Sequence, residues 1–379
     1  MLKLSIVERD AKINKVVCDM ESSGMWLDLD RLSQVTLKNE SRAAELIEEI
    51  STLAGREYKA GPNWLKKYFG DNKIKYRLNP ETGNPVFGKE GLEHIDNPVA
   101  KKILEYNNTV HHISHFLYGI DNVRVDNRLY PYIRPYGTAS GRMTYNTPNI
   151  HSMPEEFQPI ILPPPGHTLV SLDYSQQEMC LLFDYAGDLE MIRKINFSGV
   201  DVHTLTAESL NISRTMAKTI NFALIYGLGI RGLAQKLGTS MDEASNIKAQ
   251  YFRRFPRVEK FLYEVASKAR RTGFVTNWMG RKLVLDSRDK DYTMVNYLLQ
   301  SSGADILKNA MVEIYNDFSE VSIYATIHDA ILIVYPDTDA GNYCMGMVKK
   351  IMEDTYLPLN GIKLKVDVKE YKYGWGTSE

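Results

Sequence analysis

The chain has few cysteines, almost no net charge and no long apolar run. Its three cysteines, Cys18, Cys180 and Cys344, lie far apart among 379 residues and match no zinc-binding spacing. This pattern indicates a reducing compartment and excludes a disulfide framework. No apolar stretch approaches the roughly 18–20 residues that a membrane helix needs. The first residues, MLKLSIVERD, carry charge too early for a signal peptide.

The overall charge does not indicate a partner, but one region is strongly basic. Net charge is −1, and 44% of the residues are hydrophobic and 25% charged, as in soluble globular proteins of two or three domains. Between Lys248 and Lys282, however, ten basic residues are opposed only by Glu259 and Glu264. This stretch is compatible with a phosphate-facing surface and equally with a solvated helical face.

The pattern of apolar residues predicts an α+β protein with an antiparallel sheet, helices on one side of it, and additional helical lobes. Helices are expected at about 6–55, at 99–120, over most of 200–270 and at 293–318. Strands are expected at 168–172, in a hairpin around Met279–Gly280, in two strands that meet at His328–Asp329, and at 363–371, where apolar and polar residues alternate.

The segment RTMAKTINFALIYG places two cations and two aromatic residues on one face of a helix. Arg214, Lys218, Phe222 and Tyr226 recur at every fourth position, close to the helical repeat of 3.6 residues. Taken alone, such aromatics are typical of a core and such cations of a wet face. Because the cations and the aromatic residues share one face, the pattern favours a binding site for a ligand with an anionic end and a planar end, such as a nucleoside triphosphate.

Two aspartates lie beside strongly apolar strands. Asp173 follows the strand TLVSL, and Asp329 lies at the joint of two strands rich in Ile, Leu and Val. Each alone is compatible with an ordinary turn residue. Together, two carboxylates at adjacent strand ends could hold two Mg²⁺ ions about 3.5–4 Å apart, an arrangement that serves phosphoryl transfer.

The order of these motifs resembles that of family A DNA polymerases. The first carboxylate motif is DYSQQE (173–178), the helix motif is RTMAKTINFALIYG (214–227), and the second carboxylate motif is IHD (327–329). Further matches in the family's order are TASGR, PNIHSMP, DVH, YFRRFP and NYLLQSSGADI. The resemblance implies a right-hand fold with an antiparallel-sheet palm, helical fingers and a short helical thumb. The expected division is 1–120 for the N-terminal helices and thumb, 121–190 and 286–379 for the palm, and 191–285 for the fingers.

The resemblance implies DNA synthesis in which a primer 3′-hydroxyl attacks the α-phosphate of a dNTP. Asp173, Asp329 and the backbone carbonyl of Tyr174 would bind two Mg²⁺ ions, for which Mn²⁺ can substitute. Lys218 would donate a proton to the leaving pyrophosphate. The expected dNTP-binding residues are Arg214, Lys218, Phe222, Tyr226, His203, Glu178 and Gln177.

Glu178 would exclude the ribose 2′-hydroxyl, and Phe222, where some relatives carry Tyr, implies poor use of dideoxynucleotides. Two positions depart from the family: Gln177 is usually apolar, and Ala330 is commonly Glu. Hydrogen-bond donors in the minor groove check base-pair shape without reading sequence. The expected DNA-binding residues are Arg142, Asn296, Gln300, His328, Tyr226 and Gly227.

The helices that lead into the polymerase motifs begin almost at the first residue, so we expect no 3′→5′ exonuclease activity. The thumb looks short, at roughly residues 30–120, so we also expect weak processivity without a partner. These expectations favour a monomeric phage or mobile-element replicase in bacterial or infected-host cytoplasm. Its expected partners are primer–template DNA, dNTPs and separate exonuclease, helicase or processivity proteins, with no membrane. A single-subunit RNA polymerase and an inactive nucleic-acid-binding scaffold are the competing hypotheses.

Overall fold

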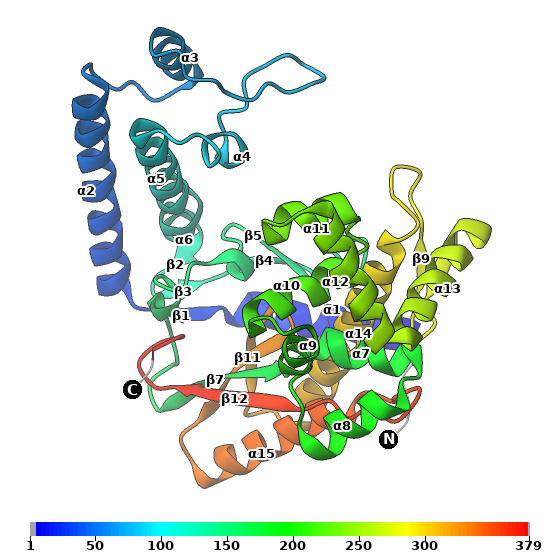
Figure 1. Ribbon diagram of the computed structural model, residues 1–379. Helices are drawn as coiled ribbons and strands as arrows, with labels where there is room; N and C mark the ends of the chain where they lie inside the picture. Colours follow the sequence, from blue (N-terminus) through cyan, green and yellow to red (C-terminus); the bar gives the residue numbers. More distant parts are fainter. Residues whose placement is uncertain (1–4, 378–379) are drawn as a thin grey trace.

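The computed structural model describes residues 5–377, and it places a helical arm on a larger body that contains an antiparallel sheet (Figure 1). The α-helices are α1 (Ile6–Ser23), α2 (Leu29–Ala54), α3 (Pro62–Asp71), α4 (Lys89–Leu92), α5 (Pro98–His112), α6 (Tyr118–Val123), α7 (Gln177–Ala186), α8 (Leu189–Ser198), α9 (Val202–Leu210), α10 (Arg214–Ile225), α11 (Ile230–Leu237), α12 (Met241–Arg254), α13 (Pro256–Thr272), α14 (Thr293–Asp317) and α15 (Asp339–Asp354). The strands are β1 (Met25–Leu27), β2 (Arg124–Val125), β3 (Arg128–Leu129), β4 (Tyr132–Arg134), β5 (Thr144–Asn146), β6 (Ile161–Leu162), β7 (His167–Tyr174), β8 (Phe274–Thr276), β9 (Lys282–Val284), β10 (Ser322–Ile327), β11 (Ala330–Pro336) and β12 (Val366–Tyr371).

The principal sheet is antiparallel throughout, in the strand order β10, β11, β7, β12. Side chains alternate between its faces along β7. Leu172 and Tyr174 are buried, and the Tyr174 hydroxyl donates to the Met352 carbonyl of α15. Ser171 and Asp173 point to the opposite face. The predicted α+β class is confirmed, and one face of the sheet is left free for a site.

The strand β1 interrupts the helical N-terminal segment. Ser5 and Glu8 form a capping box at the start of α1, and Gly24 ends the helix at φ +64°. A Cβ at position 24 would lie 2.7 Å from the Tyr130 ring, so the turn requires glycine. β1 then pairs with β3 and β6. The expectation of helices alone over 6–55 is therefore wrong at Met25–Leu27.

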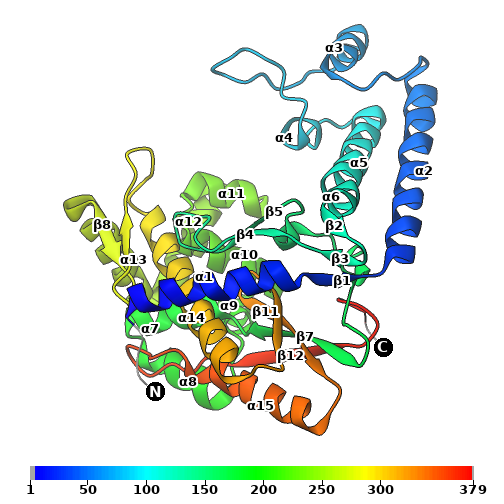
Figure 2. The ribbon, with the colours of Figure 1, turned by 180° about the vertical axis from the view of Figure 1, so that it is seen from behind.

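The arm consists of α2 and α5, which stand side by side in both views, with α3 and α4 at their far end (Figures 1 and 2). Asp28 caps the start of α2, and Gly55 ends it in the left-handed conformation. The far end of the arm has its own hydrophobic core, separate from that of the body. Its buried members are Ile50, Tyr58, Leu65, Tyr68, Phe69, Leu92, Ile95, Val99, Ala100 and Ile103.

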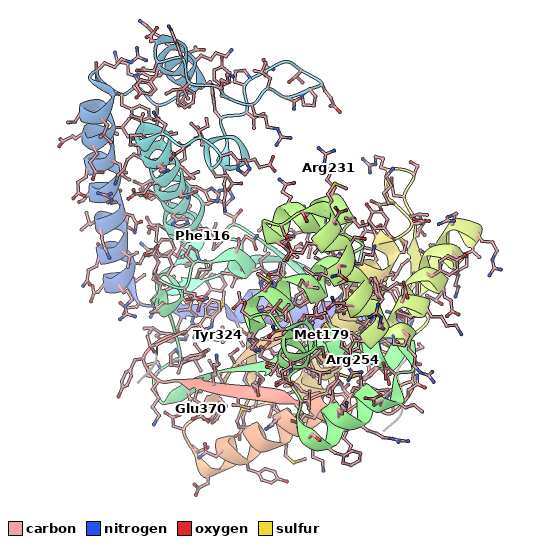
Figure 3. All side chains as sticks on the ribbon, in the orientation of Figure 1. Phe116, Met179, Arg231, Arg254, Tyr324 and Glu370 are labelled. Atoms are coloured by element: carbon pink, nitrogen blue, oxygen red, sulfur yellow. The ribbon has the colours of Figure 1, made fainter. Side chains whose placement is uncertain are left out.

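The long helix α14 is the central support of the body. It packs against α1, α7, α13 and α15, and its side chains are buried over most of its length. Met179 of α7 lies within this core, whereas Arg231 projects from the exposed surface of α11 (Figure 3). Among residues 5–377, no helix has both the length and the apolar character needed to cross a bilayer.

The predicted hairpins are confirmed, and the strand predicted at 363–371 is confirmed in part, as β12. β8 and β9 flank Met279–Gly280, and β10 and β11 meet at His328–Asp329. Burial alternates from Ile362 to Asp367 and then stops, because β12 is the edge strand and exposes Val368 and Lys369.

Candidate active site

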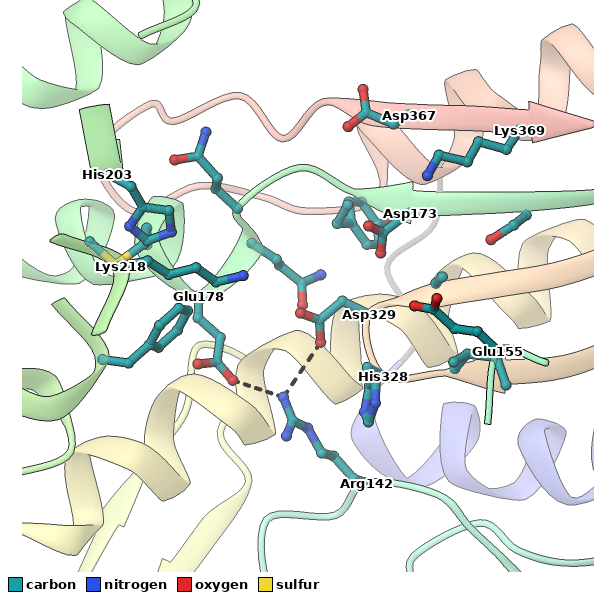
Figure 4. A pocket seen from close by; sticks show the side chains of 18 of the residues that line it. Arg142, Glu155, Asp173, Glu178, His203, Lys218, His328, Asp329, Asp367 and Lys369 are labelled. Carbon is teal, nitrogen blue, oxygen red and sulfur yellow. Dashed lines mark hydrogen bonds and ion pairs between the residues drawn. The ribbon is translucent and has the colours of Figure 1, made fainter. Parts of the chain in front are cut away.

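A cleft of about 820 Å³ lies between the free face of the sheet and helix α10. Ligand pockets of this size accommodate a molecule as large as a nucleotide. The cleft brings together most of the residues predicted from the sequence: Arg142, Asp173, Tyr174, Gln177, Glu178, His203, Arg214, Lys218, Phe222, Tyr226, His328 and Asp329. Figure 4 shows Asp173 and Asp329 on the sheet side of this cleft and Lys218 on the opposite side.

Asp173 lies near the end of β7, and Asp329 lies in the turn that precedes the adjacent strand β11. Asp173 is the register partner of Ala330, and the Tyr174 amide donates to the Asp329 carbonyl at 3.3 Å. Burial raises the pKa of the Asp329 carboxyl to about 6, with Arg142 opposing the rise and Glu178 and Asp173 adding to it. Burial, and next the Asp367 carboxylate, raises the pKa of Asp173. The positive charges near Asp173 and Asp329 therefore do not offset the effect of burial on the pKa of either carboxyl group.

Arg142 lies between two acidic residues of the cleft (Figure 4). Its Nη2 donates to Glu178 Oε1 at 2.8 Å and to Asp329 Oδ1 at 3.4 Å. The second carboxylate oxygen of Glu178 accepts from the Tyr226 hydroxyl. Burial, and next the Glu178 carboxylate, raises the pKa of Tyr226, so the hydroxyl keeps its proton and donates. The four side chains form one connected group, which we call the open cluster.

Helix α10 presents its predicted stripe to the cleft. Ser213 caps the helix, and all four stripe residues line the cavity. Arg214 is exposed and pairs with Asp201 at 2.5 Å. The Phe222 and Tyr226 rings lie 5.8 Å apart. Among the residues described, Lys218 has no salt-bridge partner, so its ammonium group is available to an anion in the cleft.

His203 also faces the cleft, as a neutral hydrogen-bond donor. Burial lowers the pKa of its imidazole, and Arg214 and Lys218 lower it further against the effect of Asp201. The Asn221 amide nitrogen, which can only donate, lies 2.8 Å from His203 Nδ1, while the Thr206 hydroxyl lies 2.9 Å from the Val202 carbonyl and 3.1 Å from Asn221 Oδ1. The ring proton is consequently on Nε2.

The residues predicted to touch DNA are only partly gathered here. His328 lines the cleft at the turn between β10 and β11, with φ +55°. Asn296 and Gln300 lie in the N-terminal half of α14 and do not line the cavity. Among the described residues, Asn296 Oδ1 has no hydrogen-bond partner. Gly227 has φ +73°, and a Cβ there would lie 2.3 Å from the Tyr292 ring, so local packing by itself requires this glycine.

The two departures from the family pattern have different surroundings. Gln177 is 1% exposed, and within residues 5–377 neither atom of its amide group has a partner. Its side chain fits against Gly303, where a Cβ would come within 2.3 Å of Gln177 Oε1. Ala330 is buried in β11. The structure offers no reason for the amide at position 177.

The sequence interpretation missed the residues of β12 that line the cleft, Asp367 and Lys369 among them. Asp367 is the register partner of Asp173, and Lys369 lies on the same face of the strand (Figure 4). Ser175 donates a hydrogen bond to Asp367. The alternation in 363–371 was sufficient to place these two side chains on one face, but nothing local indicated that β12 pairs with β7.

The carboxylates fit a divalent cation that stays open to solvent. Within residues 5–377, no group of three or more His, Cys, Asp or Glu side chains is arranged to hold a metal ion. Mg²⁺, however, keeps several waters and binds proteins through one or two carboxylates together with substrate phosphates. Asp173 and Asp329 provide such a pair, and their raised pKa values indicate that a cation would be favourable there.

Known proteins resemble this chain over most of its length. DNA polymerase I from Thermus aquaticus is 27% identical over 95% of the chain and 47% of the relative, and a DNA polymerase of Mycobacterium phage L5 is 28% identical over 68% and 43%. The chain thus spans less than half the length of these relatives. The POL domain of Pol1 from M. smegmatis, solved in complex with DNA primer-template and dNTP, shares the fold with a TM-score of 0.87 at 23% identity, over 97% of this chain and 70% of that one.

A family profile also matches nearly the whole chain. The profile of DNA polymerase family A covers residues 29–376, a range that contains both carboxylate strands, helix α10 and the arm. The motifs, the cleft and this match agree, and the chain belongs to DNA polymerase family A.

Proposed function

We propose that this chain extends a DNA primer on a template strand with dNTPs. One observation carries the proposal: Asp173 on β7 and Asp329 in the β10–β11 turn lie across a nucleotide-sized cleft from Lys218, which has no salt-bridge partner among residues 5–377. Paired carboxylates opposite a cation suit a substrate that carries both a triphosphate and a reacting centre. Family membership and the similarity to DNA polymerases support the same assignment.

The dNTP would bind along the stripe of α10. Arg214 and Lys218 would hold its phosphates, with His203 Nε2 donating a further hydrogen bond. Phe222 and Tyr226 would pack against the sugar and base. Glu178, held by Tyr226 and Arg142, would occupy the space that a ribose 2′-hydroxyl needs. Gln177 lies beside this gate and would contact the same nucleotide.

Asp173, Asp329 and the Tyr174 carbonyl would hold two Mg²⁺ ions, or Mn²⁺ in their place. Such ions stabilise negative charge on phosphate oxygens and lower the pKa of a bound hydroxyl. The protein would align the two substrates: the primer 3′-hydroxyl releases its proton to water and its oxygen bonds to the α-phosphorus, the bond to pyrophosphate breaks, and Lys218 donates a proton to the leaving oxygen.

The primer–template would contact the open side of the cleft. Arg142 and His328 would reach the terminal base pair from the sheet side, while Asn296, Gln300, Tyr226 and Gly227 would follow from α14 and the end of α10. In this proposal residues 121–190 and 286–379 form the palm, 191–285 the fingers, and the arm within 1–120 the thumb.

Narrower parts of the proposal rest on the sequence expectations. They are the absence of 3′→5′ proofreading, weak processivity as a monomer, service to a phage or mobile element with separate accessory proteins, a cytoplasmic location, and poor use of dideoxynucleotides. The similarity to a phage DNA polymerase agrees with the assignment to a phage or mobile element. Degradation of a single-stranded primer by the pure protein would contradict the first, and a chain-termination assay of Phe222→Tyr against the natural chain tests the last.

Primer extension with separate nucleotide sets tests the central proposal. The purified chain, a labelled primer–template, Mg²⁺ and either dNTPs or rNTPs are combined, and products are separated by length. Extension by dNTPs alone supports the proposal. Preferential extension by rNTPs would favour an RNA polymerase, and DNA binding without extension under either set would favour an inactive scaffold.

A further inference from the structure

A buried lysine supports the loop that carries Arg142. Lys308 of α14 is 1% exposed, and its Nζ donates to the Gly141 carbonyl. The same nitrogen lies 3.7 Å from the centre of the Tyr136 ring. Within the part of the chain described, Lys308 forms no salt bridge. A buried cation without a carboxylate partner is costly, so the position of Lys308 calls for a reason.

The charged groups around Lys308 are already paired with one another. Asp305, one turn earlier on α14, accepts from Arg9 at 2.8 Å and from Arg281 at 3.0 Å, and Arg281 also pairs with Asp10. Burial lowers the pKa of Lys308 to about 7, Asp305 and Asp10 oppose this effect, and Arg9 and Arg281 strengthen it. The direct polar contact of the lysine is therefore the backbone of the loop.

Lys308 and Thr138 hold the two ends of a single peptide group. The carbonyl of Gly141 accepts from Lys308, and the amide of Arg142 donates to Thr138 Oγ1 at 2.9 Å. Because a peptide group is planar, fixing both ends fixes the plane from which the Arg142 side chain departs. Gly141 has φ +79°, a conformation that glycine adopts without strain.

Arg142 needs such an anchor because the space around its side chain would allow the guanidinium group to take other positions. Arg142, Lys308, His151 and His328 line a cavity of about 30 Å³ behind the cleft. The Arg142 side chain is 27% exposed, and one of its two contacts, to Asp329, is long at 3.4 Å. Side-chain packing alone therefore does not determine where the guanidinium lies.

We propose that Lys308 is a positioning residue that, through the Gly141–Arg142 peptide, aims Arg142 at Glu178 and Asp329 and hence at the primer terminus. The last step of this inference rests on the proposed function. The anchoring step does not, because it concerns only the loop and α14.

The anchor is tested first without reference to activity. Hydrogen exchange of the peptide that spans residues 137–143 is compared in the natural chain, Lys308→Met and Ser302→Ala. Met has a similar length but donates no hydrogen bond. Ser302 is equally buried on α14 and bonds to Tyr185 instead of the loop. We expect at least about tenfold faster exchange at the Arg142 amide in Lys308→Met only. Unchanged exchange would overturn the anchor.

The positioning step is tested by a double-mutant cycle in primer extension. Lys308→Met should lower kcat/KM about ten- to hundredfold, with Lys308→Arg recovering part of the loss. In a protein that already carries Arg142→Ala, Lys308→Met should lower kcat/KM almost no further. Equal losses in both backgrounds would show a merely structural role and overturn the proposal. If the natural chain extends no primer, the proposed function fails while the exchange result still decides the anchor.

Thr138→Val keeps the test decisive if Lys308→Met does not fold. Thr138 is exposed, and valine has nearly its shape but offers no oxygen to the Arg142 amide. Its loss should be smaller than that of Lys308→Met and should likewise vanish on the Arg142→Ala background. A loss that persists there would count against the proposal.

Discussion

Two charged clusters lie near the loop that carries Arg142, and both combine guanidinium groups with carboxylates. In the closed cluster, formed by Arg9, Asp10, Arg281 and Asp305, Asp305 is fully buried and meets two guanidinium groups and the Asn277 amide. In the open cluster, Asp329 is 27% exposed and meets one guanidinium group at 3.4 Å. The Asp305 carboxylate of the closed cluster is satisfied by hydrogen bonds within the protein, whereas the Asp329 carboxylate of the open cluster can still accept hydrogen bonds from a ligand or bind a cation.

The largest expected effect comes from the open cluster. Asp329→Asn removes a proposed metal-binding carboxylate while keeping its shape, so primer extension should fall by at least about 10³-fold. Glu320→Gln, at an exposed position, is the matched control and should retain full activity. An Asp329→Asn protein that keeps more than a tenth of the natural rate would remove Asp329 from the mechanism.

The closed cluster should respond in stability instead. Asp305→Asn leaves the buried Arg9 and the half-buried Arg281 with Asp10 as their remaining carboxylate partner, and breaking a buried ion pair costs about 3–5 kcal/mol. Urea denaturation monitored by circular dichroism measures the change. Asp329→Asn should shift stability by less than about 1 kcal/mol in the same assay, as partly exposed pairs do. Similar losses in the two variants would remove the distinction between the clusters.

A pH series sharpens the comparison through Lys308, which lies between the two clusters. The pKa of Lys308 is lowered from 10.5 to about 7 by burial. Between these values the unfolded chain binds one more proton than the native one, so native stability rises with pH; below 7 the contribution is constant. From pH 7 to 9 the natural chain should gain on the order of 2 kcal/mol relative to Lys308→Met in urea denaturation. Parallel pH profiles would contradict this.

The smallest expected effect concerns substrate choice at Glu178. Glu178→Ala opens the space near the expected 2′-position, so preference for dNTP over rNTP should fall by about tenfold or more. Single-nucleotide kcat/KM values for the two substrates give the ratio. Glu178→Gln fills the same volume without charge and should keep most of the preference. If Glu178→Ala leaves the ratio unchanged, Glu178 is not the gate.

The sequence predicted the parts of this site that local patterns encode. Strand patterns predicted that Asp173 follows a strand and that Asp329 lies at a hairpin turn. Helical spacing predicted that Arg214, Lys218, Phe222 and Tyr226 share one face of α10. The pairing of β12 with β7, which brings Asp367 opposite Asp173, joins segments far apart in the chain and has no local signal. The same holds for the contact of Lys308 with Gly141. β1 was missed because three residues between two long helices carry too little periodicity to be recognised.

The separate hydrophobic core at the tip of α2 and α5 makes the reach of the arm adjustable. Its apolar contacts move with the tip and do not involve the cleft. Adding one turn to both helices would carry the tip outward by about 5.4 Å while every carboxylate of the body stays in place. Short insertions in α2 and α5 could therefore change how far along a duplex the arm reaches, without changing the residues of the cleft.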